Sequence, residues 1–191
     1  MKLFLTFLLA IAIAAPSLAQ HRLGHDPLTS AEADKLRDTA TEPNQRLKLY
    51  VEFARARMTS IDQLLADPKA KDRPAQLHDL LEDFSTLVDE IADNVDMYHS
   101  QQWDIRKSLK LVIESASEFQ LKLRQLSATK KSSEDAEQYK FVLQDATESL
   151  NNNADDARRT MQEQNELAKS NKLKKEDKPV GRPVSSDVPH N

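Results

Sequence analysis

The chain has 191 residues, a formal net charge of −4 at pH 7, no cysteine and only two glycines. The lack of cysteine excludes disulfides, thiolate metal sites and c-type haem attachment. Charged residues make up 30% of the chain and aromatic residues 5%, which is typical of a helical bundle and lacks the basic excess of a nucleic-acid-binding protein.

The first nineteen residues have the pattern of a signal peptide. Lys2 precedes an apolar run over 3–15, and Ser17 and Ala19 place small residues at the −3 and −1 positions of a cleavage site. The run is shorter than the roughly 20 apolar residues that span a membrane. We therefore expect residues 1–19 to be removed and the protein to be exported, with no stable membrane insertion afterwards. No Asn-x-Ser/Thr sequon occurs, which favours the periplasm or exterior of a bacterial cell.

A short helix is predicted directly after an irregular leader. Residues 20–28 contain glycine, proline and two histidines and show no apolar period. Thr29 followed by Glu32 is a capping box, in which each side chain accepts a hydrogen bond from the other residue's backbone. The helix that begins there is expected to end near Thr39.

Two longer helices follow, each with a proline in its first turn, where the missing N–H is not needed. Pro43 opens the first of them, which is expected to end at Asp67. Asp72 and Pro74 predict the N-cap and first turn of the second. Apolar residues alternate at spacings of four and three: Leu47, Val51, Ala54, Met58, Ile61 and Leu65, then Leu77, Leu81, Phe84, Val88, Ile91, Val95 and Tyr98.

The same alternation continues from Ile105 to Leu126 without a glycine or proline. One continuous helix over 74–126, about 80 Å long, fits the sequence. Two helices joined by a turn within Tyr98 to Trp103 also fit. The unbroken register favours the continuous helix, whereas compactness favours the turn.

The apolar phase slips at Ser127 to Ser133, and a last helix is predicted from there to about Ser170. The first half of its seam is apolar and the second half is polar. The seam comprises Ala136, Tyr139, Leu143, Ala146, Leu150, Asn153, Ala157, Thr160, Gln164 and Leu167. Residues 171–191 have no apolar pattern and are predicted to be a disordered tail.

These elements predict an all-α fold with one domain over 29–170. Spacings that average 3.5 residues indicate left-handed, coiled-coil-like packing at shallow angles. Additional apolar residues widen each stripe beyond a two-stranded seam. We expect an antiparallel bundle of three or four long helices.

The histidines are weak candidates for metal binding. His21 and His25 have helical ligand spacing, but a glycine and a proline beside them oppose a helix. Asp96 and His99 form one D-x-x-H pair, while a di-iron bundle needs two such pairs and further inward carboxylates. The sequence therefore predicts no metal site and no cofactor.

No catalytic constellation is present in the sequence. Without strands there is no strand-to-helix turn to carry a nucleophile. Both glycines lie near the chain ends, so no phosphate-binding loop or dinucleotide motif is possible. We expect the protein not to be an enzyme.

One segment is strongly acidic and is a candidate interaction face. Between Pro74 and Ile105 there are eight acidic residues and no lysine or arginine. Pairing with basic neighbouring helices explains this pattern, and so does docking of a basic partner, for which Asp89, Asp93 and Asp96 are the candidates.

A second candidate face lies on the polar half of the last helix. Asn153, Thr160 and Gln164 interrupt its seam, and residues 151–170 offer few large apolar side chains to a core. We expect this segment to fray in the monomer or to be completed by a second copy or another protein.

The most direct interpretation is a non-enzymatic exported protein that acts through protein–protein contacts, as a scaffold, adaptor or holdase in the cell envelope. A bundle that binds a small ligand or a metal is the alternative. Membrane-surface binding is disfavoured, because the apolar stripes are wide enough to need one another.

Overall fold

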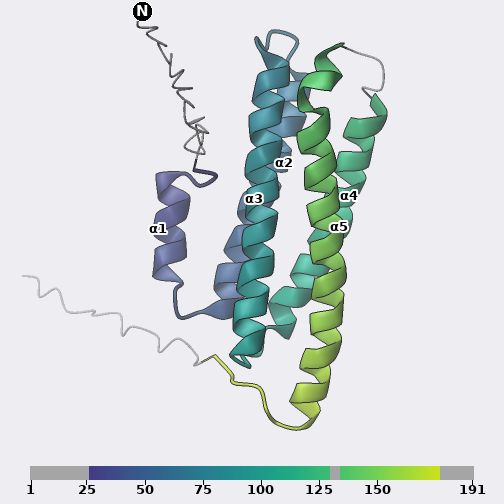
Figure 1. The fold of residues 1–191 in the computed structure, drawn as a ribbon. Helices are drawn as coiled ribbons and strands as arrows, with labels where there is room; N and C mark the ends of the chain where they lie inside the picture. The colour runs from purple at the N-terminus through teal and green to yellow at the C-terminus, as the bar shows by residue number, and fades with distance from the viewer. Residues whose placement is uncertain (1–25, 130–133, 177–191) are drawn as a thin grey trace, which may run out of the picture.

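The computed structural model describes residues 26–129 and 134–176 (Figure 1). This part of the chain forms five helices and no strand, which confirms the predicted all-α fold. The helices are α1 (Ser30–Asp38), α2 (Pro43–Ala66), α3 (Arg73–Ser100), α4 (Arg106–Thr129) and α5 (Glu134–Lys169). The predicted signal peptide, most of the leader with His21 and His25, and residues 177–191 lie outside the described residues.

Two of the three predicted helix starts have the expected local chemistry. Thr29 caps α1 through a full capping box: its hydroxyl accepts from the Glu32 amide, and its own amide donates to the Glu32 carboxylate at 2.8 Å. Pro43 occupies the first turn of α2. Asp72 and Pro74 occupy the predicted N-cap and first turn of α3, but Asp72 has a φ of 53° and its side chain makes no capping hydrogen bond.

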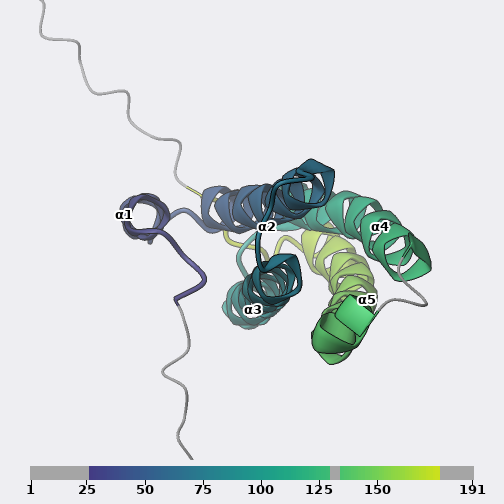
Figure 2. The same ribbon diagram turned by 90° about the horizontal axis from the view of Figure 1, so that it is seen from above.

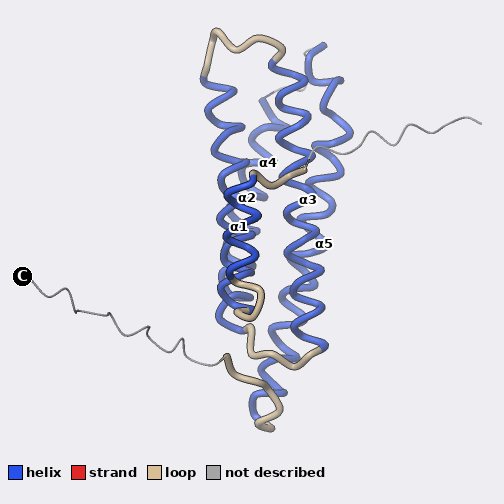
Figure 3. Tube along the Cα trace, turned by 90° about the vertical axis from the view of Figure 1, so that its left-hand side faces the viewer, coloured by secondary structure: helices blue, strands red, loops and turns tan. Residues whose placement is uncertain are grey.

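Four helices form a ring in which α2 contacts α3 and α4, and α5 contacts the same two helices (Figure 2). The sequential pairs α2/α3 and α4/α5 run antiparallel. The α3–α4 turn crosses the bundle on a diagonal, and the remaining neighbours, α3/α5 and α2/α4, therefore run parallel. The ion pairs Arg55–Glu118 and Lys122–Asp62 join α2 to α4 in this parallel order. The long helices run along a common direction, and the loops that connect them lie at the two ends of the bundle (Figure 3).

The core lies on the bundle axis and is made of the residues that the alternation of four and three predicts. All seven predicted apolar positions of α3 are buried, as are those from Ile105 to Leu126. Phe84 and Phe119, from diagonally opposed helices, meet edge to face with ring centroids 5.3 Å apart. Such pairs are favoured by the aromatic quadrupole.

The favoured continuous helix over 74–126 is wrong, because α3 ends at Ser100 in a Schellman motif. The amide of Trp103 donates to the Tyr98 carbonyl at 3.0 Å, and the amide of Gln102 donates to the His99 carbonyl at 2.8 Å. Gln102 has a φ of 62°, the left-handed conformation that a glycine normally supplies at this position. The turn begins within Tyr98 to Trp103, as the alternative prediction had it, but the sequence lacks the glycine that usually marks such a helix end.

Distant residues satisfy the backbone groups that this turn exposes. The Gln164 side chain of α5 accepts from the Ile105 amide at 3.2 Å and donates to the Trp103 carbonyl at 2.8 Å. The backbone of Lys174 pairs with Gln102 and Asp104 in two hydrogen bonds of 2.7 Å. Because of these contacts, the chain can leave the helix here without burying unpaired backbone N–H and C=O groups.

The first residues of the predicted disordered tail take part in the fold. Residues 171–176 pass beside the α3–α4 turn, where Lys174 forms the backbone pairing described above. The Glu176 carboxylate then accepts a hydrogen bond from the Asn44 amide in the first turn of α2. The α2 N-cap residue Glu42 makes no side-chain hydrogen bond, so Glu176 supplies the anionic group that a helix N-terminus favours.

Helix α1 lies outside the ring, against α2 (Figure 2). Arg57 of α2 holds the start of α1 through a bidentate pair with Glu32, at 2.7 and 3.0 Å. Arg46 holds its end by donating to the Leu36 carbonyl at 2.7 Å. The short helix is therefore attached by charged hydrogen bonds as well as by the buried side chain of Leu36.

Candidate functional site

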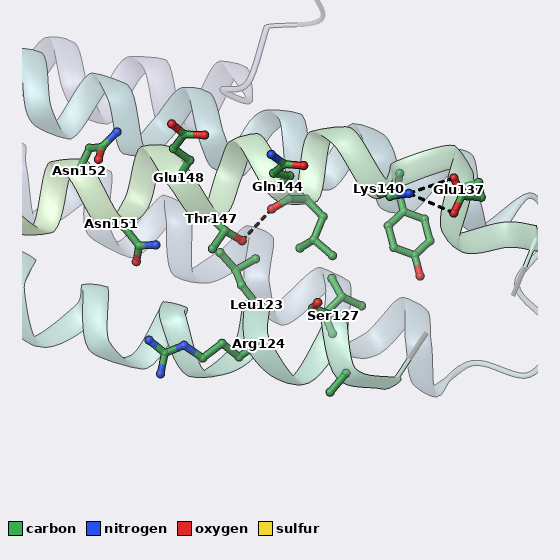
Figure 4. Close-up of a pocket in the computed structure, with 14 residues that line it drawn as sticks. Leu123, Arg124, Ser127, Glu137, Lys140, Gln144, Thr147, Glu148, Asn151 and Asn152 are labelled. Carbon is green, nitrogen blue, oxygen red and sulfur yellow. Dashed lines mark hydrogen bonds and ion pairs between the residues drawn. The ribbon is translucent and has the colours of Figure 1, made fainter. Parts of the chain in front are cut away.

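A groove lies in the described surface between the end of α4 and the first half of α5. It is open to solvent and has a volume of about 710 Å³. Leu123, Leu126, Tyr139 and Leu143 are among the apolar residues that line it. Polar side chains of α5 line its other side, as Figure 4 shows. We call this hollow the α4–α5 groove.

Helical spacing explains the composition of the polar wall. Glu137, Lys140, Gln144 and Thr147 recur at intervals of three and four residues, and Glu148 lies four residues after Gln144. All five therefore share one face of α5. Lys140 lies 3.4 Å from the Glu137 carboxylate, and the Thr147 hydroxyl donates to the Leu143 carbonyl at 2.7 Å. These local contacts leave the groove itself open.

Toward the middle of the bundle a polar bridge joins the two walls of the groove. The Gln120 side chain donates to the Asn151 side chain at 2.8 Å. The groove therefore extends along α5 from Glu137 to Asn152, about 22 Å at 1.5 Å per residue. This length matches about four turns of a docked helix.

The lining of the groove combines apolar and polar side chains. Its described part contains no histidine and no cysteine. Apolar side chains flanked by polar ones suit an amphipathic helix or a small apolar molecule. Two large apolar side chains near this region are exposed, Phe141 by 73% and Leu121 by 58%.

The structure leaves part of the predicted acidic face open to solvent. Asp89, Asp93 and Asp96 all have exposed side chains on α3. The Asp89 carboxylate accepts hydrogen bonds from Ser149 and Asn153 of α5 and so helps to join the two helices. Asp93 and Asp96 are the members that remain accessible to a basic partner.

The polar seam of α5 is not an exposed face in the folded chain. Thr160 is buried, and Gln164 is fully buried with 0% exposure. Asn153 is half-buried and donates to the Val88 carbonyl at 3.2 Å. The prediction that these residues meet a partner is therefore wrong for Thr160 and Gln164, because the α3–α4 turn and the neighbouring helices already occupy that space.

The Gln164 contacts determine which nitrogen of His99 carries the proton. The backbone partners of Gln164 place its amide nitrogen toward His99, where it lies 3.3 Å from Nδ1. An amide nitrogen donates, so Nδ1 accepts, and Nε2 donates to the Glu163 carboxylate at 2.9 Å. Both ring nitrogens of His99 are used in this way, which removes the basis for a metal site with Asp96.

A different histidine cluster lies near the start of α3. His78, Asp79 and Glu82 bring three ligand atoms within 4.8 Å of one another, the one such group within the described residues. The two acidic side chains are exposed, and the His78 ring lies 3.4 Å from the Asp79 carboxylate. Exposed pairs of this kind are common without a metal, and the cluster by itself assigns no site.

The buried charges next to α1 have a structural role. The Arg57 side chain is 11% exposed and lies between Glu32 and Asp83. Burial alone would raise the pKa of Glu32, but hydrogen bonds from Arg57 and Thr29 outweigh it and lower that pKa. The hydrogen bond to Glu32 likewise raises the pKa of Arg57. A carboxylate and guanidinium kept charged in this way attach α1 to the bundle.

No pattern in the sequence directly indicates the α4–α5 groove, although one signal of it is present. Phe141 lies outside the predicted seam of α5, where a large aromatic side chain has no core to enter. The phase slip at 127–133 also coincides with the end of the bundle where the groove opens.

A comparison with protein-family models, with curated proteins and with solved structures finds no match to this chain. The fold places it in the broad class of four-helix bundles with an added N-terminal helix. No helix in the described ranges combines the length and apolar character needed to cross a membrane.

Proposed function

We propose that this protein is a non-enzymatic exported protein that acts through protein–protein contacts, as a scaffold, adaptor or holdase, and that the α4–α5 groove is its contact site. The observation that carries the proposal is the pairing of an apolar-lined cavity with a nearby aromatic side chain, Phe141, that is 73% exposed. Exposed apolar surface bordered by polar residues marks interaction sites. Export rests on the signal-peptide pattern of residues 1–19.

Site-specific photo-cross-linking tests this proposal in the native envelope. A photoreactive residue replaces Gln144, which is exposed and lines the groove. The matched control replaces Glu52, which is exposed on α2, the helix diagonally opposite α5. We expect a discrete protein adduct from position 144 and none from position 52. Equal yields at both positions, or no adduct, would contradict the proposal.

The second candidate function is binding of a small apolar ligand in the same groove. The cavity of about 710 Å³ favours it, since ligand pockets are commonly about 300–1,000 Å³ in volume. Native mass spectrometry of the purified protein separates the two functions. A stoichiometric bound small molecule that is lost on Leu143→Arg substitution would favour the ligand, and its absence would favour the protein contact.

A further inference from the structure

The end of the bundle that holds the α3–α4 turn carries an excess of basic side chains. Residues 101–107 of the turn and residues 166–176 at the end of α5 meet there, because Lys174 pairs with the backbone of Gln102 and Asp104 (Figure 1). We call these two segments the basic tip. Six basic and three acidic residues give the tip a formal charge of +3, whereas the whole chain has −4. The rest of the sequence therefore carries −7.

The three acidic residues of the tip already have partners. Asp104 pairs with Arg106 at 2.8 Å. Glu166 pairs with Lys169 at 2.7 Å. The Glu176 carboxylate accepts a hydrogen bond in the first turn of α2. The other basic side chains of the tip are exposed and form no ion pair within the described residues, namely Lys107, Lys172, Lys174 and Lys175. These four charges are therefore available to an anionic partner.

The one tryptophan of the chain lies among these lysines. Trp103 forms the backbone bridge with Lys174, and its side chain is half-buried against the core. Its indole N–H donates to the exposed Gln101 side chain at 3.2 Å. Leu173, next along the chain to Lys174, is also half-buried. A tryptophan with an apolar part against the core and a polar edge near water suits the level of lipid headgroups, where such rings are enriched.

We propose that the basic tip docks end-on to a membrane surface that contains anionic phospholipid. The four unpaired lysines lie against the headgroups, and Trp103 lies at the headgroup level. Clusters of four or more basic residues bind such surfaces electrostatically, and each residue strengthens binding by about fivefold. The contact uses the end of the bundle and leaves the apolar stripes of the helices in the core. It therefore needs neither insertion of a helix nor loss of core packing.

The charge of the remaining surface favours a flat partner over a long flexible polyanion. Helix α3 exposes Asp93 and Asp96 within two turns of its end at the tip. A nucleic acid that wraps past the tip would meet these carboxylates, whereas a planar membrane touches the tip alone. The unpaired bases are all lysines, which attract phosphate as point charges and lack the bidentate fork with which arginine reads guanine. Residues 177–191 contain two acidic and two basic residues, so their formal charges cancel.

End-on docking leaves the α4–α5 groove accessible, so the inference goes beyond the proposed function without competing with it. The groove borders the first half of α5 and the tip follows its second half, toward the opposite end of the bundle (Figure 1). A protein held at a membrane by one end and open to a partner near the other fits an adaptor. The two proposals can fail separately, because cross-linking at position 144 reports on the groove whether or not the tip meets lipid.

Sedimentation of the protein, purified after export, with lipid vesicles tests the membrane contact. Vesicles of phosphatidylcholine alone are compared with vesicles that also contain phosphatidylglycerol. We expect binding to the anionic vesicles only, with a shift of the Trp103 fluorescence to shorter wavelength. Because the chain has one tryptophan, this signal reports on the tip alone. Raising the ionic strength from about 0.1 M to about 1 M shortens the Debye length from about 10 Å to about 3 Å and should release the protein.

Charge-neutralising variants test the residues of the tip. Lys172→Gln and Lys174→Gln, made together, should weaken binding to anionic vesicles by about tenfold or more. Both side chains are exposed, so the fold should persist, and circular dichroism checks that it does. The matched control combines Lys69→Gln and Lys71→Gln, which remove the same charge from the α2–α3 loop at the opposite end of the bundle. This control should change binding by less than about twofold.

Four outcomes would overturn the inference. The first two are no binding to anionic vesicles and equal binding to both kinds of vesicle. The third is an equal loss of binding in the two double variants. The fourth is tighter binding to duplex DNA than to anionic vesicles at the same phosphate concentration, which would assign the tip to nucleic acid. The same fluorescence shift with inorganic phosphate alone would also contradict a membrane contact, because it would reduce the tip to a phosphate site.

Discussion

The two halves of α5 differ in a way that composition alone does not anticipate. The second half is polar, yet Thr160 and Gln164 are buried and the latter bonds to the α3–α4 turn. The first half is apolar, yet it borders the α4–α5 groove and exposes Phe141. The half of α5 that packs closely is the half whose buried polar groups have hydrogen-bond partners. The amount of apolar surface alone does not decide which half packs.

The contrast has a physical cause in the turns at the two ends of the bundle. The α3–α4 turn exposes backbone groups that need partners, and a long polar side chain such as Gln164 can reach them. At the other end, Leu123 and Leu126 leave space between α4 and α5 that no described side chain fills. Unfilled apolar space can accept a partner. Polar groups that already have hydrogen-bond partners offer no further contacts to one.

Removing the Gln164 side chain should have the largest effect on stability. Gln164→Ala removes the partner of the buried Ile105 amide and of the part-buried Trp103 carbonyl and creates a cavity, so we expect a loss of about 3 kcal/mol. Chemical denaturation measures the change. Gln162→Ala, at an exposed position two residues away, is the control and should change stability by less than about 0.5 kcal/mol. Equal effects at the two positions would refute the role of Gln164.

Hydrogen exchange should be slower in the polar second half of α5 than in its apolar first half, the opposite of what their compositions suggest. We predict that amides around Ala157 and Thr160 exchange as slowly as those of α3 in the dilute monomer, because buried side chains surround them. Amides around Lys140 and Gln144 should exchange at least about tenfold faster, because their helix borders the open groove. Faster exchange in the polar half would restore the prediction that 151–170 frays.

Replacing Gln102 with glycine should stabilise the turn that Gln164 holds. Gln102 has a φ of 62°, which costs a residue with a Cβ about 1 kcal/mol more than it costs glycine. Its backbone pairing with Lys174 does not depend on the side chain. Gln102→Gly should therefore raise the free energy of unfolding by up to about 1 kcal/mol, measured by denaturation. Gln102→Ala, which keeps the Cβ, is the control and should give no such gain.

Acid should weaken the end of the bundle that contains Gln164. The hydrogen bond from Arg106 lowers the pKa of Asp104 below its usual 3.8. The ionised carboxylate therefore stabilises the folded state above pH 3.8, and this contribution is lost as the pH falls through the lower pKa of the folded state. Asp104→Asn should reduce the acid dependence of unfolding. Part of it should remain, because the pKa of Glu32 is lowered as well. An unchanged slope would contradict this assignment.

The smallest effect on stability is expected at Phe141. Its side chain is 73% exposed, so Phe141→Ser should change the stability of the monomer by less than about 0.5 kcal/mol. Leu143→Ala, two residues away and buried, should cost about 2 kcal/mol or more by denaturation at low concentration. A large loss from Phe141→Ser would mean that the ring has a structural role and would weaken the case for the groove.

The sequence by itself determined the helices and their buried faces. The alternation of four and three predicted the core of α3 and α4 residue by residue, because helical geometry brings such positions to one side whatever the surroundings. The same periodicity placed Thr160 and Gln164 on the inner seam. Capping at Thr29 and the first-turn proline Pro43 were equally predictable, since both depend on neighbours a few residues away.

Only the tertiary structure decided where α3 ends, how the helices are ordered and which surfaces stay open. The turn at Gln102 has no glycine and is supported by Gln164 and Lys174, more than 60 residues further along the chain. Residues 171–176 are held by the same contacts, which no pattern within the tail predicts. A periodic pattern records local geometry, whereas the hydrogen-bond partners of a turn and the gap between two helices exist only after distant segments have come together.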